Sequence, residues 1–70
     1  MAAGSEALRR AWEHDSAGRE HEAIVEYRAA LEAGVPDEDL LGAMLGFGST
    51  LRNVGELEES ERVLREAVPL

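Results

Sequence analysis

Residues 18–31 read GREHEAIVEYRAAL, in which a glycine precedes apolar residues spaced three and four apart. This spacing places the apolar residues on one face of a helix: Ala23, Ile24, Tyr27, Ala30 and Leu31. Charged residues such as Glu22, Glu26 and Arg28 lie on the opposite face. The pattern is typical of a helix with a single buried stripe, and it predicts one over residues 20–33.

Glycine and proline divide the rest of the chain into segments of similar length. Gly18, Gly34 and Gly55 stand where a helix is expected to end, because glycine takes the left-handed backbone conformation there without steric cost. Ser5 and the acidic run 37–39 can cap the helices that they open. No run of residues alternates with the period of a strand. We expect an all-α chain with helices over 5–16, 20–33, 38–53 and 57–68.

The outer helices also carry apolar stripes, and the third differs from them. The stripe of the first helix holds Ala7, Leu8, Ala11 and Trp12, and that of the fourth holds Leu57, Leu64, Ala67 and Val68. The third has apolar residues around most of its circumference: Leu40, Leu41, Met44, Leu45, Phe47, Leu51 and Val54. We therefore expect it to be the central helix, enclosed by its neighbours. Its glycines predict close helix contacts that offset their low helix propensity: Gly42, Gly46 and Gly48.

Sliding the chain on itself by 37 residues brings its two halves into register. Gly18 then falls on Gly55, and Ala30 falls on Ala67. The larger apolar residues also match, with Leu8 on Leu45, Tyr27 on Leu64 and Leu31 on Val68. A helix, a turn with glycine and a second helix, repeated once, is the pattern of a helical solenoid. We expect a single domain over residues 1–70, with one repeat at about 4–34 and another at about 38–70.

Two motifs carry a family resemblance. The first is Gly18-x-x-x-x-Ala23-Ile24-x-x-Tyr27-x-x-Ala30-Leu31, and the second is Met44-x-x-Phe47-Gly48-x-x-Leu51-x-x-x-Gly55-x-Leu57-x-x-Ser60-x-x-x-Leu64-x-x-Ala67. Both resemble tetratricopeptide repeats, and strings such as residues 11–20 look like a bacterial family of this type. The resemblance implies two helix-turn-helix repeats, with four antiparallel helices forming an α-solenoid segment.

The chain departs from the usual tetratricopeptide pattern in three respects. Its repeats are 37 residues apart, where about 34 is usual, because the loop from Gly34 to Asp39 is longer. Arg10 and His14 occupy positions that are usually apolar, so the first helix is expected to be rotated or partly exposed. No additional helix follows the second repeat to cover its last apolar face. The chain is therefore expected to be a fragment of a longer array, or to pair with a second copy.

The resemblance also implies a binding surface, because tetratricopeptide arrays bind ligands on a concave face lined by the first helix of each repeat. Carried over by position, the partner-binding residues are Arg9, Trp12, Leu45, Ser49, Arg52 and Asn53. Arg52 and Asn53 offer hydrogen bonds to a peptide backbone or carboxylate, although they also fit an ordinary solvated helix end. Trp12 is interpreted as a core residue, with an interface anchor as the alternative. The lysine-based carboxylate clamp of chaperone-binding relatives is excluded, because the chain has no Lys.

The composition argues against several functions. The net charge is −8, which disfavours nucleic acid and anionic membranes and favours a basic protein or peptide partner. His14 and His21 lie near acidic residues but lack a fixed zinc-ligand spacing, so no metal site, cofactor or catalytic site is expected. The absence of Cys and of a signal or spanning segment predicts a cytoplasmic protein without disulfides.

Two functions remain open on the sequence. The first is a protein-protein interaction module of tetratricopeptide type that binds a peptide or protein segment on its concave face. The second is a structural homodimerisation module with no external ligand, which would supplement the marginal core of a chain of 70 residues. In solution we expect a dimer or larger species, and a stable monomer would count against self-association. Neither function requires an enzyme.

Overall fold

The computed structural model describes residues 2–67, and all of its regular structure is helical. The helices are α1 (Ser5–Ser16), α2 (Glu20–Ala33), α3 (Asp37–Asn53) and α4 (Leu57–Ala67). The expected boundaries agree to within one residue, except that Val68 lies outside the described residues. Positive φ angles of 78°, 97° and 90° at Gly18, Gly34 and Gly55 confirm that the glycines sit in the turns that follow the first three helices.

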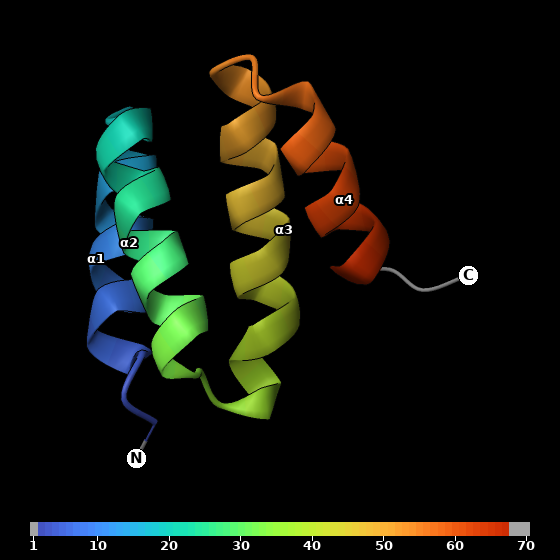
Figure 1. The fold of residues 1–70 in the computed structure, drawn as a ribbon. Helices are drawn as coiled ribbons and strands as arrows, with labels where there is room; N and C mark the ends of the chain where they lie inside the picture. The colour runs from blue at the N-terminus through green and yellow to red at the C-terminus, as the bar shows by residue number, and fades with distance from the viewer. Residues whose placement is uncertain (1, 68–70) are drawn as a thin grey trace.

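The helices pack as two antiparallel hairpins laid side by side. The first hairpin is α1 with α2, the second is α3 with α4, and α2 packs against α3 between them (Figure 1). α1 also makes a small contact with α3. α3 is the only described helix on which α4 packs along its length. The fold is all-α, as expected, and α3 is the helix that links the two hairpins.

The helix starts differ from the expected caps. The residue preceding α1 is Gly4, and Ser5 is already the first helical residue, so no side chain caps this helix. Pro36 precedes α3 in the same way, and no carboxylate of the acidic run accepts a capping hydrogen bond. Asp37 and its acidic neighbours instead lie in the first turn, where they meet the positive end of the helix dipole.

The core is built around Tyr27, which is fully buried. Its hydroxyl donates a 2.8 Å hydrogen bond to Oδ2 of Asp15, so α1 and α2 are joined by a polar contact as well as by packing. Burial and the Asp15 carboxylate raise the pKa of Tyr27, which keeps its proton on the donor. The ring centroid of Phe47 lies 6.0 Å from that of Tyr27, and this contact joins α2 to α3.

Two of the three glycines of α3 lie at close helix contacts, and the third does not. A Cβ on Gly46 would lie 2.9 Å from Cζ of Tyr27, and closer still to its hydroxyl oxygen. A Cβ on Gly48 would lie 2.6 Å from Cγ of Leu64, and the carbonyl of Gly48 accepts a 2.7 Å hydrogen bond from Ser60. At Gly42 the nearest atom would be 3.9 Å away, in ordinary contact, so the expectation of close packing there is wrong.

α3 is covered on two sides rather than all round. Phe47 and Leu51 are buried, but the side chains of Leu40, Leu41 and Leu45 are exposed to solvent. The expectation of an enclosed α3 is therefore only half right, because α2 and α4 pack on it and the side between α1 and α4 stays open. The expected stripe of α4 is also shifted, since the buried residues are Ser60 and Val63 and the first leucine, Leu57, is 61% exposed.

Arg28 fastens the two hairpins together from the side of α2. Its Nη1 and Nη2 donate hydrogen bonds of 2.6 and 2.7 Å to the two carboxylate oxygens of Glu59 on α4. Its guanidinium also lies 5.4 Å from the ring centroid of Phe47, a cation–π contact. The hydrogen bonds from Arg28 hold the pKa of Glu59 below its usual value. The carboxylate form of Glu59 is therefore the one that the fold stabilises.

The different surroundings of two α3 glycines predict opposite effects of the same substitution. Alanine gains up to about 1 kcal/mol of helix propensity over glycine, so Gly42→Ala should raise the free energy of unfolding. Gly46→Ala should lower it by about 1–3 kcal/mol, because the new methyl meets the buried Tyr27 ring. Urea denaturation followed by circular dichroism measures both. Equal stabilisation by the two variants would contradict the close contact.

The lowered pKa of Glu59 predicts a specific sensitivity to acid. The stabilisation is fully present above the ordinary Glu pKa of about 4.3, and it is lost as the pH falls below that value through the lower folded-state pKa. Glu59→Gln should therefore show a smaller fall in Tm between about pH 5 and pH 2.5 than the unmodified chain. Glu58→Gln is the control, since it removes the same charge from an exposed residue of the same helix. An equal fall in Tm with pH for the two variants would contradict a stabilising pair between Arg28 and Glu59.

Candidate functional site

The candidate residues lie on two exposed stripes, one on α1 and one on α3. On α1, Ser5, Arg9 and Trp12 follow one another at spacings of four and three residues, which places them on one helix face. On α3, Leu45, Ser49 and Arg52 follow one another at the same kind of spacing, and all three are exposed. Asn53 is exposed at the last position of α3.

The two stripes meet where α1 touches α3. A Cβ on Gly42 would lie 3.9 Å from Cζ2 of Trp12, so the indole ring sits over this glycine of the neighbouring helix. Leu45 lies one turn along α3 from Gly42. Trp12 and Leu45 therefore flank the same part of the surface. We name this surface the α1–α3 face, formed by Arg9, Trp12, Gly42, Leu45, Ser49, Arg52 and Asn53.

Trp12 is not a core residue, which corrects the first interpretation of its position. It is 42% exposed, whereas Leu8, one turn earlier on the same helix, is 1% exposed. The indole ring lies beside Gly42 of α3 and leaves room for a Cβ there, so it is covered only in part. Leu45 is 38% exposed, so the α1–α3 face has an apolar centre.

The two arginines of the α1–α3 face have different surroundings. Arg9 forms ion pairs with Glu6 and Glu13 along α1, so its charge is already matched within the helix. Among the residues that the structure describes, Arg52 and Asn53 form no side-chain ion pair or hydrogen bond. The donors of Arg52 and the donor and acceptor of Asn53 are therefore open to solvent at the end of α3.

Leu41 is an exposed residue that the sequence analysis assigned to the enclosed helix. It is 52% exposed and lies four residues before Leu45, on the same face of α3. Leu41 and Leu45 are four residues apart, as are the buried Ala43 and Phe47, but the two pairs are offset by two residues and therefore lie on different faces of α3. The sequence analysis expected Leu41, Leu45 and Phe47 all to be covered, so it missed the open side of this helix.

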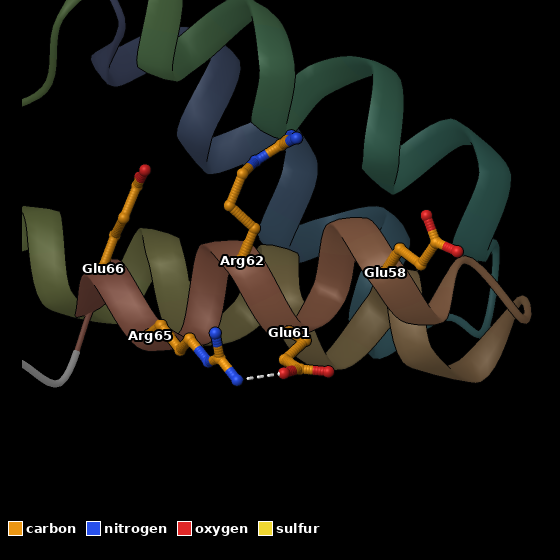
Figure 2. A pocket seen from close by; sticks show the side chains of 5 residues that line it. All are labelled: Glu58, Glu61, Arg62, Arg65 and Glu66. Atoms are coloured by element: carbon orange, nitrogen blue, oxygen red, sulfur yellow. Dashed lines mark ion pairs between the residues drawn. The ribbon is translucent and has the colours of Figure 1, made fainter.

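A hollow of about 350 Å³ lies over α4, and none of the candidate residues lines it. Its walls are charged side chains of this one helix: Glu58, Glu61, Arg62, Arg65 and Glu66. Figure 2 shows Glu61 and Arg65 on one side of the helix, joined by an ion pair, and the other three on the opposite side. The hollow is open to solvent and lined by a single helix, so it does not enclose a small molecule as a binding pocket would.

The charged turn between α1 and α2 has local partners. Nε of Arg19 donates a 2.8 Å hydrogen bond to Nδ1 of His14, and Arg10 pairs with Glu26 at 3.0 Å. Arg10 and His14, the two polar residues at usually apolar positions of α1, therefore each have a hydrogen-bond partner. Within residues 2–67, no three His, Asp or Glu side chains gather in a way that would hold a metal ion.

The structure has the features of a helical repeat: two helical hairpins, small residues at the helix contacts and glycines in the turns. A comparison with known families identifies the type of repeat. A family model described as tetratrico peptide repeat matches residues 4–69. The chain belongs to the tetratricopeptide repeat family. No curated protein and no solved structure gave a significant match to it.

Membership of the tetratricopeptide repeat family gives the general function of this protein. Tetratricopeptide repeats are protein-interaction modules, and they are typically non-catalytic. Protein partners are therefore the class of ligand that the family implies. None of the four described helices is both long and apolar enough to cross a membrane.

Proposed function

We propose that this tetratricopeptide protein binds a peptide or protein segment on the α1–α3 face. The observation that supports the proposal is the exposed Trp12 beside the exposed Leu45, since a small folded chain gains stability by burying such side chains. Trp is enriched among the residues that dominate binding energy at protein interfaces. α1 and α3 are the first helices of their hairpins, which is the position that lines the concave face in this family.

The proposed contacts divide between an apolar centre and a polar end. An apolar side chain of the partner would cover the indole of Trp12 and the side chain of Leu45. Arg52 and Asn53 would then hydrogen-bond to the backbone of the partner or to one of its carboxylates, because neither is engaged by another described side chain. Ser49 lies between the apolar centre and the polar end, where its hydroxyl can donate or accept a hydrogen bond.

The charge of the chain sets the preferred partner. With a net charge of −8 the protein attracts basic segments over tens of ångströms at low salt, and this accelerates their association. The same charge opposes contact between two copies. The proposal is therefore a basic or neutral peptide segment with at least one bulky apolar residue.

Peptides selected from a random display library on the immobilised protein test the proposal. Trp12→Ala should weaken the affinity of such peptides about ten-fold or more, and the double variant Arg52→Ala with Asn53→Ala should weaken it less. Val25→Ala is the matched control, because Val25 is 66% exposed on α2, away from the α1–α3 face. Titration calorimetry measures the affinity, and circular dichroism checks that helicity is kept. Affinities that none of these changes lowers would contradict the proposed face.

Light scattering at low micromolar concentration separates this function from homodimerisation. A monomer that keeps its helicity on dilution would leave the α1–α3 face free for an external peptide, as we propose. A dimer that separates when Trp12 is replaced by alanine would place a second copy on the face. That result would contradict the proposal and favour the structural function.

A further inference from the structure

A carboxylate lies at the contact between α1 and α3, and only one of its oxygens is engaged. Asp15 follows Trp12 by three residues, so the two side chains lie on the same side of α1, about one turn apart. Oδ2 of Asp15 accepts the 2.8 Å hydrogen bond from the hydroxyl of Tyr27. Oδ1 accepts no hydrogen bond from any group of residues 2–67. This second oxygen therefore takes no part in holding the fold together.

The free oxygen of Asp15 reaches solvent. The residue as a whole is partly buried, and yet no side-chain oxygen or nitrogen of the described residues is both enclosed and without a hydrogen-bond partner. Because Oδ1 has no partner, it is not enclosed, and it opens onto the surface. A carboxylate oxygen in this position can accept a further hydrogen bond from water or from a bound ligand.

α3 presents only small or polar residues beside Asp15. Gly42 lies beside the indole of Trp12, and the residues that follow it at spacings of four, three and four share its side of the helix: Gly46, Ser49 and Asn53. Gly46 meets the same Tyr27 hydroxyl that donates to Asp15. A side chain of a partner can therefore approach both Trp12 and Asp15 without meeting a bulky residue of α3.

The Tyr27 hydroxyl fixes the direction in which Asp15 points. Tyr27 is fully buried, and its burial together with the Asp15 carboxylate raises the pKa of the phenol, so the hydroxyl remains a donor. A hydrogen bond from such a fixed group holds the carboxylate in one orientation before a ligand arrives, which reduces the entropy lost on binding. Asp15 is thus a preorganised acceptor rather than a mobile surface charge.

The basic groups near Asp15 on the first hairpin are already engaged. Arg9 pairs with two glutamates of its own helix. Arg19 donates a hydrogen bond to His14, whose side chain leaves α1 about 100° round the axis from that of Asp15. No ion pair joins Asp15 to a basic residue of the described chain. A cation from outside the chain would therefore meet an unpaired carboxylate.

The other charged groups on this side of the molecule lie on α3 and α2. Arg52 follows Gly46 by six residues, about a third of a turn round α3 from the side that meets Tyr27 and about 9 Å further along the axis. It is positioned for a carbonyl or carboxylate of the partner rather than for Asp15. Glu20 precedes Tyr27 by seven residues on one face of α2 and adds a second acidic group. The surroundings of Asp15 therefore favour a cation, with an acceptor for Arg52 about three extended residues away.

The half-exposed ring of Trp12 favours a cation in the same place. Trp is the aromatic side chain that attracts a cation most strongly to its face. Lys and Arg carry a charged head on an apolar stem, so the stem can lie on the indole while the head reaches Oδ1 of Asp15. A purely apolar side chain over both groups would instead remove water from the carboxylate without replacing its hydrogen bond, which costs free energy.

We propose that Asp15 is the residue of the α1–α3 face that selects a basic side chain, a Lys or Arg of the bound segment whose stem lies on Trp12. The inference rests on the peptide-binding function proposed above and makes it more specific. The partner carries its basic residue at one defined position, next to the apolar residue that covers Leu45, and not merely an excess of positive charge.

Parallel selections from one random peptide library, on the unmodified protein, Asp15→Asn and Glu22→Gln, test the inference. Asp15→Asn removes the charge but keeps the size of the side chain and an acceptor for the Tyr27 hydroxyl. Glu22→Gln is the matched control, because it removes the same charge from an exposed position on the opposite face of α2. Peptides selected on the unmodified protein and on the control should share a Lys or Arg at a fixed spacing from their bulky apolar residue. Those selected on Asp15→Asn should share the apolar residue alone.

One peptide selected on the unmodified protein and its neutral analogue then measure the contact directly. Norleucine replaces a lysine and citrulline replaces an arginine, so the stem is kept and the charge is removed. In titration calorimetry the analogue should bind about ten-fold or more weakly to the unmodified protein and to Glu22→Gln. On Asp15→Asn the two peptides should differ by less than about three-fold. Circular dichroism checks that each variant keeps its helicity.

The outcomes separate this inference from the function on which it rests. Selected peptides without a fixed basic position would overturn the role of Asp15 alone, provided that Trp12→Ala still weakens their binding. An analogue that loses as much affinity on Asp15→Asn as on the unmodified protein would do the same. A library that yields no binding peptide, or peptides that Trp12→Ala leaves unaffected, would contradict the α1–α3 face itself and the role of Asp15 with it.

Discussion

The approach of α3 to the Tyr27 ring is the contact on which the rest of the structure depends. Tyr27 is held from behind by its hydrogen bond to Asp15, so the ring presents a fixed surface that α3 can meet only where it has no side chain. Gly46 supplies that position, and Phe47 then packs beside the ring and under Arg28. This close contact and the Arg28–Glu59 pair together hold the two hairpins against each other, and so fix the geometry of the α1–α3 face.

The positions of the helices and turns could be predicted from the sequence, but the side that each helix buries could not. Glycines at positions 18, 34 and 55 mark local backbone requirements, which are independent of tertiary packing, so the boundaries could be predicted closely. The exposure of Leu57 and the open side of α3 could not be predicted, because they depend on which neighbours are present. A helix that is apolar all round indicates that something covers it, but not whether the cover lies within the chain.

The candidate site shows the same division between local and tertiary information. The family pattern assigned Trp12, Leu45, Arg52 and Asn53 to one surface, and their helical spacing agrees with that assignment. The exposure of Trp12 could not be deduced from the stripe of α1, because it depends on how much of that stripe α2 and α3 cover. Leu41 was missed for a related reason, since hydropathy alone does not distinguish a buried leucine from one on an open groove.

The ion-paired surface of α1 gives the molecule a polarity along the direction in which its hairpins stack. Glu6 and Arg10 form an ion pair at the surface of α1, so an apolar helix that covered this side would have to displace water from charged groups. Tandem concatenation of the whole unit would consequently place a charged seam between successive copies, and each joint would be weaker than the contact between α2 and α3. A longer array made by repeating the second hairpin alone would avoid that seam, because the charged helix α1 would then occur only once.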